Sequence, residues 1–202
     1  MTGTKGIFAI IERIENGFPI IFPTTTLPGL GCKPIPSALD KLFELKKRDH
    51  SKPVSIAVAN LEQARELVEL SEYAIQLIQA FPPSSLSVIL PAKSPLDKRV
   101  GGTNIAIRLI SHPIAKHLIE IVGPLTATSA NIADQPVEST CEAAAESLNM
   151  PFDAILEGKC QGGLPSTLVS ISSNLGKPES VIIIREGVVP RQDVEQWSPN
   201  QN

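Results

Sequence analysis

Short blocks of hydrophobic residues follow one another along this chain. The spacing of the hydrophobic residues is typical of a helix in some blocks and of a strand in others. Isoleucines at helical spacing predict a helix over residues 4–16, which Gly17 would end. Further helices are predicted at 36–48, from Asn60 to about Leu70, from Ser71 to about Ala80, at 113–122 and at 141–148. Short apolar runs predict strands at 19–22, 54–59, 86–90, 105–109, 125–128, 152–156, 167–171 and 181–185. This irregular order predicts an α/β (α+β-like) fold, with helices packed on a mixed sheet.

The length and composition fit one domain with a sizeable core. The chain has 202 residues, of which 42% are hydrophobic. It contains no apolar run of about 18 residues, so no membrane-spanning helix is expected. The first residues lack the apolar core and the cleavage site of a signal peptide. We therefore expect a cytoplasmic protein, with a loose polar tail after about Arg191.

Cysteine, histidine and overall charge exclude several classes of site. Cys32, Cys141 and Cys160 are widely separated and include no CxxC pair, which favours a reducing compartment and argues against structural zinc. The three histidines show no metal-ligand spacing either, so no resident metal is predicted. The net charge of −3 is unusual for a general nucleic-acid binder, although it leaves room for a local basic cleft.

The stretch around which the chemistry is organised is residues 19–32. A buried strand is predicted to end at Pro23, and three threonines and a Gly29-Leu30-Gly31 turn follow it. A small-residue loop after a strand is a common ligand site in α/β proteins, because backbone N–H groups can approach an anion there. The next helix ends in Lys46-Lys47-Arg48. Loop and helix end together could hold a polyphosphate, although an ordinary turn and a solvated helix end give the same pattern.

Six motifs in this chain resemble, in order, those of the YrdC/Sua5 family. They are Pro23-Thr24 with Gly29-Leu30-Gly31, Lys46-x-Arg48 with Lys52-Pro53, Ile105–Arg108 with His112-Pro113, Thr128–Asn131, Pro165–Val169, and Ile184-Arg185-x-Gly187. The resemblance implies a single YrdC-like domain over residues 5–190, a twisted mixed sheet with a concave binding cleft, followed by the polar tail at 191–202.

The resemblance also implies an activity, that of an L-threonylcarbamoyladenylate synthase. Such an enzyme would use L-threonine, bicarbonate and ATP, with Mg²⁺ expected beside the ATP, and would release pyrophosphate. Its product would serve N6-threonylcarbamoylation of adenosine 37 in tRNA, through a downstream transferase complex. The implied class is a nucleotidyltransferase.

The family pattern implies site residues as well. Lys46 and Arg48 would be catalytic and hold the ATP phosphates, while Arg108 would bind the threonine carboxylate or the carbamate. The implied substrate- and nucleotide-binding residues are Thr24, Thr26, Lys52, Arg108, Thr128, Ser129, Asn131, Ser166 and Arg185. A cationic clamp suits the reaction, since negative charge builds up on phosphate oxygens in the transition state.

The chain departs from the family pattern at several positions, which keeps two alternatives open. The family acid is Thr25 here, its tyrosine is Pro28, its Pro-Gly-Pro-x-Thr segment is Pro82–Leu86, and Asp134 follows the Ser-Ala-Asn motif where glycine is frequent. These changes fit a YciO-like paralogue with weak or different carbamoyl-adenylate chemistry. A double-stranded RNA-binding module without catalysis is the other alternative, and its RNA affinity would fall steeply with salt.

Overall fold

The computed structural model describes residues 3–172 and 179–199. The helices are α1 Gly3–Glu15, α2 Pro36–Lys46, α3 Leu61–Leu67, α4 Glu72–Ala80, α5 Pro113–Val122, α6 Cys141–Ser147 and α7 Arg191–Gln196, with 3₁₀ turns η1 Lys98–Val100 and η2 Phe152–Ala154. The strands are β1 Ile20–Phe22, β2 Gly29–Gly31, β3 Ser55–Val58, β4 Leu86–Pro91, β5 Asn104–Leu109, β6 Leu125–Ser129, β7 Thr167–Ser172 and β8 Ser180–Arg185.

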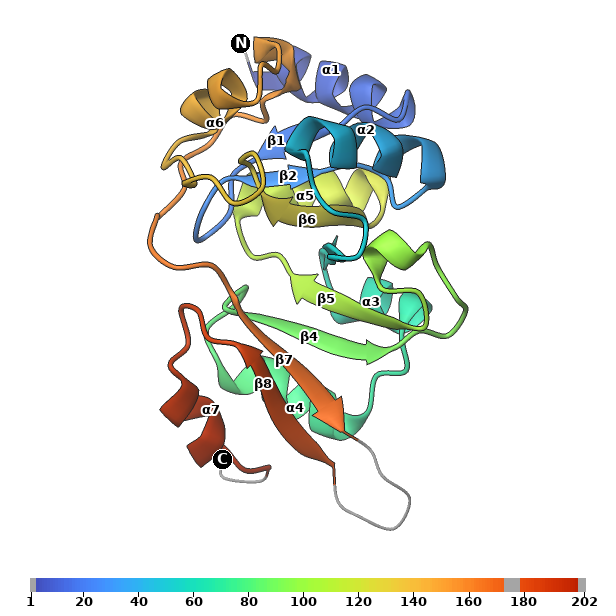
Figure 1. The fold of residues 1–202 in the computed structure, drawn as a ribbon, viewed down its shortest axis with the longest axis vertical. Coiled ribbons are helices and arrows are strands. Elements are labelled where there is room, and N and C mark those ends of the chain that lie inside the picture. Colours follow the sequence, from blue (N-terminus) through green and yellow to red (C-terminus); the bar gives the residue numbers. More distant parts are fainter. Residues whose placement is uncertain (1–2, 173–178, 200–202) are drawn as a thin grey trace.

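The strands form one mixed sheet in the order β1-β2-β6-β3-β5-β4-β7-β8. Two neighbouring pairs, β3 with β5 and β4 with β7, run parallel, and the other pairs are antiparallel. Figure 1 shows helices α1, α2, α5 and α6 around the β1–β2–β6 end of the sheet and α4 and α7 around the β7–β8 end. The predicted mixed sheet with flanking helices is confirmed.

Both faces of the sheet are covered near β1, which explains its unbroken apolar sequence. Ile20 and Phe22 pack into a core cluster with residues of α1 and α5, whereas Ile21 points to the other face and joins the larger core under α2 and α6. A strand buried on both faces reads as a continuous hydrophobic run rather than an alternating one. This fully buried strand leads directly into the threonine loop.

The glycine segment that we expected to be only a turn is strand β2. It pairs with β1 on one side and with β6 on the other. Side chains at its two glycines would collide with the Phe22 ring, and at Gly31 also with the Thr126 carbonyl. The two glycines therefore let the strand lie directly against its neighbours.

Two other predictions were wrong. Residues 152–156 form η2 and a single bridge between Ile155 and Ile21 instead of a strand. The expected loose tail is helical from Arg191, because Val194 is buried in the core; residues 200–202 lie outside the described part of the chain. Within the described ranges, no helix is long and apolar enough to cross a membrane.

Candidate active site

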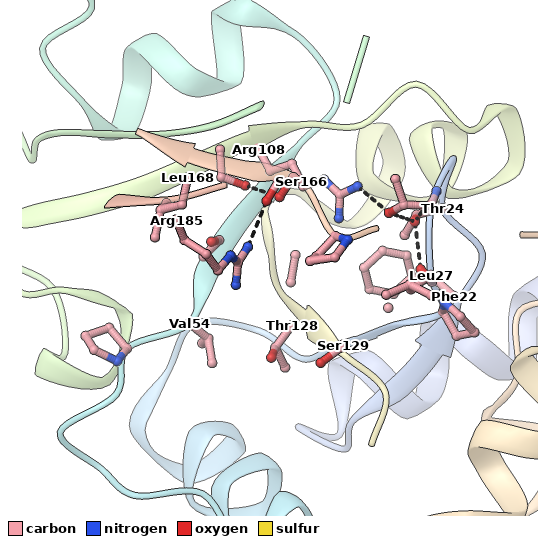
Figure 2. Close-up of a pocket in the computed structure, with 18 of the residues that line it drawn as sticks. Phe22, Thr24, Leu27, Val54, Arg108, Thr128, Ser129, Ser166, Leu168 and Arg185 are labelled. Atoms are coloured by element: carbon pink, nitrogen blue, oxygen red, sulfur yellow. Dashed lines mark hydrogen bonds between the residues drawn. The ribbon is translucent and has the colours of Figure 1, made fainter. Parts of the chain in front are cut away.

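A cavity of about 210 Å³ opens between the two ends of the sheet. One wall is the loop after β1 together with the end of β6, and the other comes from β4, β7 and β8 (Figure 2). Eight of the eleven predicted site residues line it, namely Thr24, Thr26, Arg48, Arg108, Thr128, Ser129, Ser166 and Arg185. The fold thus brings residues from all six sequence motifs together around one cavity.

Arg108 reaches the cavity from β5 and is only partly held by the protein. Its Nε donates to the Ser84 carbonyl at 3.1 Å, and its Nη2 donates to Thr26 Oγ1 at 2.9 Å. Burial, and then the neighbouring Arg185, lower the pKa of Arg108 to about 10. The guanidinium is therefore still charged at neutral pH, and donors remain for a ligand.

Two further arginines flank the cavity in the same manner. Arg48 donates to the carbonyls of Lys52 at 2.8 Å and Pro53 at 3.1 Å, and Arg185 donates to the Ser166 carbonyl at 2.8 Å. Burial lowers the pKa of both guanidinium groups. Backbone carbonyls therefore orient these arginines without neutralising them, and a ligand can supply the opposing charge.

Hydroxyl groups line the cavity together with the arginines. Thr24 Oγ1 donates to the Leu27 carbonyl at 2.7 Å and accepts the Thr26 N–H at 3.0 Å, which closes the loop after β1 on itself. Ser166 Oγ lies 2.8 Å from Ser87 Oγ on β4. Together with Thr128 and Ser129 they give the cavity neutral hydrogen-bonding groups beside its cations.

Lys46 lies beneath the cavity and does not line it. Its Nζ is buried and donates to the carbonyls of Ser129 at 2.5 Å and Asn131 at 2.7 Å, and to Asn131 Oδ1 at 3.3 Å. Burial, with a smaller contribution from Arg48, lowers the pKa of Lys46 to about 8. The ammonium group therefore holds the backbone after β6 from below.

Asn131 and Lys52 also lie outside the cavity. Asn131 Oδ1 accepts from Ser129 Oγ at 2.6 Å, and its amide donates to the carbonyls of Ile132 and Gln135. Lys52 is exposed, and its Nζ is 3.8 Å from Asp134. Asn131 thus shapes the segment that presents Ser129, and Lys52 remains at the surface.

Three serines that take part in this arrangement were not predicted from the sequence. Ser55 and Ser87 line the cavity from β3 and β4, and the backbone of Ser84 orients Arg108. Ser55 closely follows the Lys52-Pro53 motif, which was a usable signal. Ser84 lies in the altered segment 82–86 and has a positive φ of 67°. No sequence signal indicated its contact with Arg108, which joins residues 24 positions apart.

The residues present do not fit a resident magnesium ion. In the part of the chain that the structure describes, no aspartate or glutamate lines the cavity. No group of three or more His, Cys, Asp or Glu residues capable of holding a metal occurs in residues 3–172 and 179–199. Magnesium is usually bound through one or two carboxylates together with substrate phosphates. Any Mg²⁺ at this site would enter with a nucleotide, as part of the substrate.

The sequence is similar to one family over most of its length. The model of the Sua5/YciO/YrdC family, described as telomere recombination, matches residues 12–187. A putative threonylcarbamoyl-AMP synthase of Methanocaldococcus jannaschii is 31% identical over 183 residues, which are 90% of this chain and 85% of the relative. The threonylcarbamoyl-AMP synthase of Vibrio campbellii is 32% identical over 165 residues, or 78% of this chain and 89% of the relative.

Solved structures share the architecture. Sua5 of P. abyssi complexed with L-threonine has a TM-score of 0.81 at 29% identity, covering 96% of this chain and 57% of that one. The present chain therefore spans a little more than half of that relative. YciO of E. coli has a TM-score of 0.79 at 22% identity and covers 94% and 93% of the two chains. This second likeness concerns the fold alone.

Proposed function

The chain belongs to the Sua5/YciO/YrdC family, as its six motifs predicted, and from this premise we propose that it is a threonylcarbamoyl-AMP synthase. It would join L-threonine, bicarbonate and ATP into threonylcarbamoyl-AMP and pyrophosphate, as a nucleotidyltransferase. The observation that carries the proposal is a cavity lined by three arginines and a set of hydroxyls, with no carboxylate among the described residues that line it. Such a site suits a substrate with several negative charges.

The arginines match the charge changes of this reaction. The amine of L-threonine combines with bicarbonate to give a carbamate, whose oxygen attacks the α-phosphorus of ATP and displaces pyrophosphate. Negative charge then builds up on the phosphate oxygens, where preoriented donors contribute most. Arg48 and Arg185 would bind the phosphates, held in place by the carbonyls of Lys52, Pro53 and Ser166. A magnesium ion carried by ATP would neutralise part of the phosphate charge.

Arg108 and the threonine loop suit the amino-acid end of the substrate. Arg108 has donors left for a carboxylate or carbamate after its contacts with Ser84 and Thr26. Thr24 and Ser129 lie on opposite sides of the same space (Figure 2). Lys46 and Asn131 would act as positioning residues, because their contacts fix the backbone that carries Ser129.

Pyrophosphate release by the purified protein tests the proposal. ATP and Mg²⁺ are supplied throughout, and L-threonine and bicarbonate are added separately and then together. We expect release only when both are present, with threonylcarbamoyl-AMP detected by mass spectrometry. Release that needs neither, or ATP binding without release, would contradict the proposal and favour the YciO-like alternative. This alternative is tested because Thr25 and Pro28, in the loop after β1, differ from the acid and the tyrosine of the family pattern.

The product would pass to a second enzyme. Threonylcarbamoyl-AMP is a mixed anhydride that water hydrolyses, so a transferase acting on tRNA would have to take it up promptly. Adding such a transferase and unmodified tRNA to the assay should convert adenosine 37 to its threonylcarbamoyl form. RNA binding by this chain alone would appear as an affinity that falls steeply with salt.

A further inference from the structure

Two cysteines that are 19 positions apart in the sequence meet beside the active site. The Sγ atoms of Cys141 and Cys160 are 3.9 Å apart, although no sequence motif pairs them. Cys141 is buried in the first turn of α6, and Cys160 is partly exposed. Cys32, the third cysteine, is buried next to Thr126 on β6, in a separate part of the structure.

The two cysteines belong to elements that differ in how they are held. Helix α6 begins at its Thr140 cap and packs against β1, with Cys141, Ala144 and Ala145 in the core. Cys160 lies in the connection from η2 to β7, which runs along the side of the molecule as an orange trace in Figure 1. This connection carries no helix or strand between residues 157 and 166. It can therefore shift more readily than α6.

The connection forms part of the cavity wall, which links the cysteine pair to the site. Gly162 N–H donates to the Thr26 carbonyl at 2.9 Å, and His112 Nε2 lies 3.2 Å from the Lys159 carbonyl. Farther along, Pro165 and Ser166 line the cavity, and the Ser166 carbonyl orients Arg185. Hydrogen bonds and a short stretch of backbone thus connect Cys160 to both Thr26 and Arg185.

We propose that Cys141 and Cys160 form a reversible disulfide, and that this bond displaces the connection and weakens the active site. The thiols are already in contact, and forming the bond of about 2.05 Å requires an approach of roughly 1.9 Å. Because Cys141 is buried in the core, we expect Cys160 to make most of this movement, toward α6. The effect on turnover rests on the proposed function, whereas the formation of the disulfide does not.

The chemistry balances with a small-molecule disulfide such as oxidised glutathione. The more exposed thiolate, Cys160, attacks one sulfur and expels the first glutathione as a thiolate, which takes up a proton. Cys141 then loses its proton, attacks the Cys160 sulfur and expels the second glutathione. The two protein thiols lose two electrons and two protons, and one glutathione disulfide becomes two glutathione molecules.

The electrostatic surroundings support Cys160 as the attacking group. The hydrogen bond with Cys141 and a weaker effect of a backbone hydrogen bond from Thr24 lower the pKa of Cys160 to about 7. Burial and the nearby Glu142 act in the opposite direction and raise this pKa, but by less. Burial raises the pKa of Cys32 to about 11. Cys160 is therefore deprotonated more readily than Cys32 and is the better attacking group.

Mass spectrometry of the full chain tests the bond itself. The protein is equilibrated with mixtures of reduced and oxidised glutathione, trapped with a thiol-alkylating reagent and digested. We expect a peptide cross-linked between Cys141 and Cys160, with Cys32 alkylated, and its loss on adding dithiothreitol. A stable glutathione adduct on Cys160, or no cross-link at any mixture, would overturn the proposal.

The consequence for the site is measured on the oxidised and reduced protein in parallel. A displacement of about 1 Å of a positioned group can lower a rate by up to about 100-fold, so we expect about tenfold slower pyrophosphate release from the oxidised form. Cys160→Ser should keep the activity of the reduced protein and lose its response to glutathione disulfide. Equal rates of the oxidised and reduced proteins would contradict the link to the site.

A second readout separates this proposal from the proposed function. If the reduced protein releases no pyrophosphate, the synthase assignment fails while the cross-link can still be observed. Hydrogen exchange in residues 157–166 then reports the displacement, because pulling Cys160 toward α6 strains the bond from Gly162 to Thr26. We expect faster exchange of the Gly162 amide on oxidation, and unchanged exchange there would refute the displacement.

Discussion

Two cations near the active site, Lys46 and Arg108, both lack a carboxylate partner among the described residues, but they differ in how many of their donors contact the protein. Lys46 is 1% exposed, and its ammonium donates to three protein oxygens. Arg108 faces the cavity and uses only Nε and Nη2 for protein contacts. A buried or half-buried cation is therefore available for a ligand when it has more N–H donors than there are protein acceptors around it.

The site therefore consists of a support, Lys46 and Asn131, and a binding surface, Arg48, Arg108 and Arg185. Lys46 and Asn131 stabilise the backbone after β6, and their donors are used within the protein. Arg48, Arg108 and Arg185 are each anchored to carbonyl or hydroxyl oxygens and keep further donors free toward the cavity. Substitutions in the binding surface should change turnover most, and those in the support should also change stability.

Arg108→Ala should have the largest effect. Removing one preoriented donor from a developing negative charge typically lowers the rate about 100- to 1,000-fold. We expect a loss of this size in pyrophosphate release, with an unchanged circular dichroism spectrum. Arg65→Ala, which removes an exposed arginine on α3, is the matched control and should retain normal activity. Near-normal turnover of Arg108→Ala would remove Arg108 from the binding surface.

Arg48→Ala should rank next, with a loss of about 100-fold in ATP-dependent turnover. Arg48 is anchored by two carbonyls on its own chain segment, so its removal leaves the fold intact. Steady-state kinetics at varied ATP concentration measure the effect. Arg48→Ala should lose turnover without losing stability, whereas Lys46→Met should lose both. The same losses in both variants would contradict the division into support and binding surface.

Lys46→Met should lower both stability and turnover. The methionine fills the space, but the carbonyls of Ser129 and Asn131 lose their buried donor. We expect the free energy of unfolding to fall by about 2 kcal/mol and turnover to fall about tenfold, since Ser129 is no longer held. Urea unfolding and pyrophosphate release measure the two effects. The control is Lys47→Met, at the exposed neighbouring position, which should change neither. Lost turnover at full stability would place Lys46 in the binding surface instead.

The smallest effect is a pH dependence. Burial lowers the pKa of Lys46 from 10.5 to about 8, so above pH 8 the unfolded chain binds more protons at this residue than the folded one. The contribution of Lys46 to the free energy of unfolding therefore increases as the pH rises from 8 toward 10.5. Relative to Lys46→Met, the wild type should gain about 1 kcal/mol in urea unfolding between about pH 7 and about pH 9. A constant difference between the two proteins over this range would contradict the lowered pKa.

Local sequence signals were sufficient for most elements of the fold. Asn60, Ser71 and Thr140 were predicted as helix caps, and each accepts a backbone N–H in the structure. The irregular alternation of strands and helices predicted the mixed sheet. These predictions succeeded because capping and hydrophobic period depend on residues only a few positions apart. Strand β2 was missed since its glycines have no strand preference of their own and pair only because Phe22 and β6 lie against them.

The sequence by itself also determined most of the candidate site, through motifs that fix residue type and order. It placed Thr24, Arg48, Arg108 and Ser166 in one site, and the cavity contains all four. Only the tertiary structure decided where the donors of Lys46 point, because its partner Ser129 is 83 positions away. It likewise decided that Cys141 and Cys160 meet. A motif specifies which side chains are present, whereas contacts between distant segments decide which acceptors within the protein each side chain contacts.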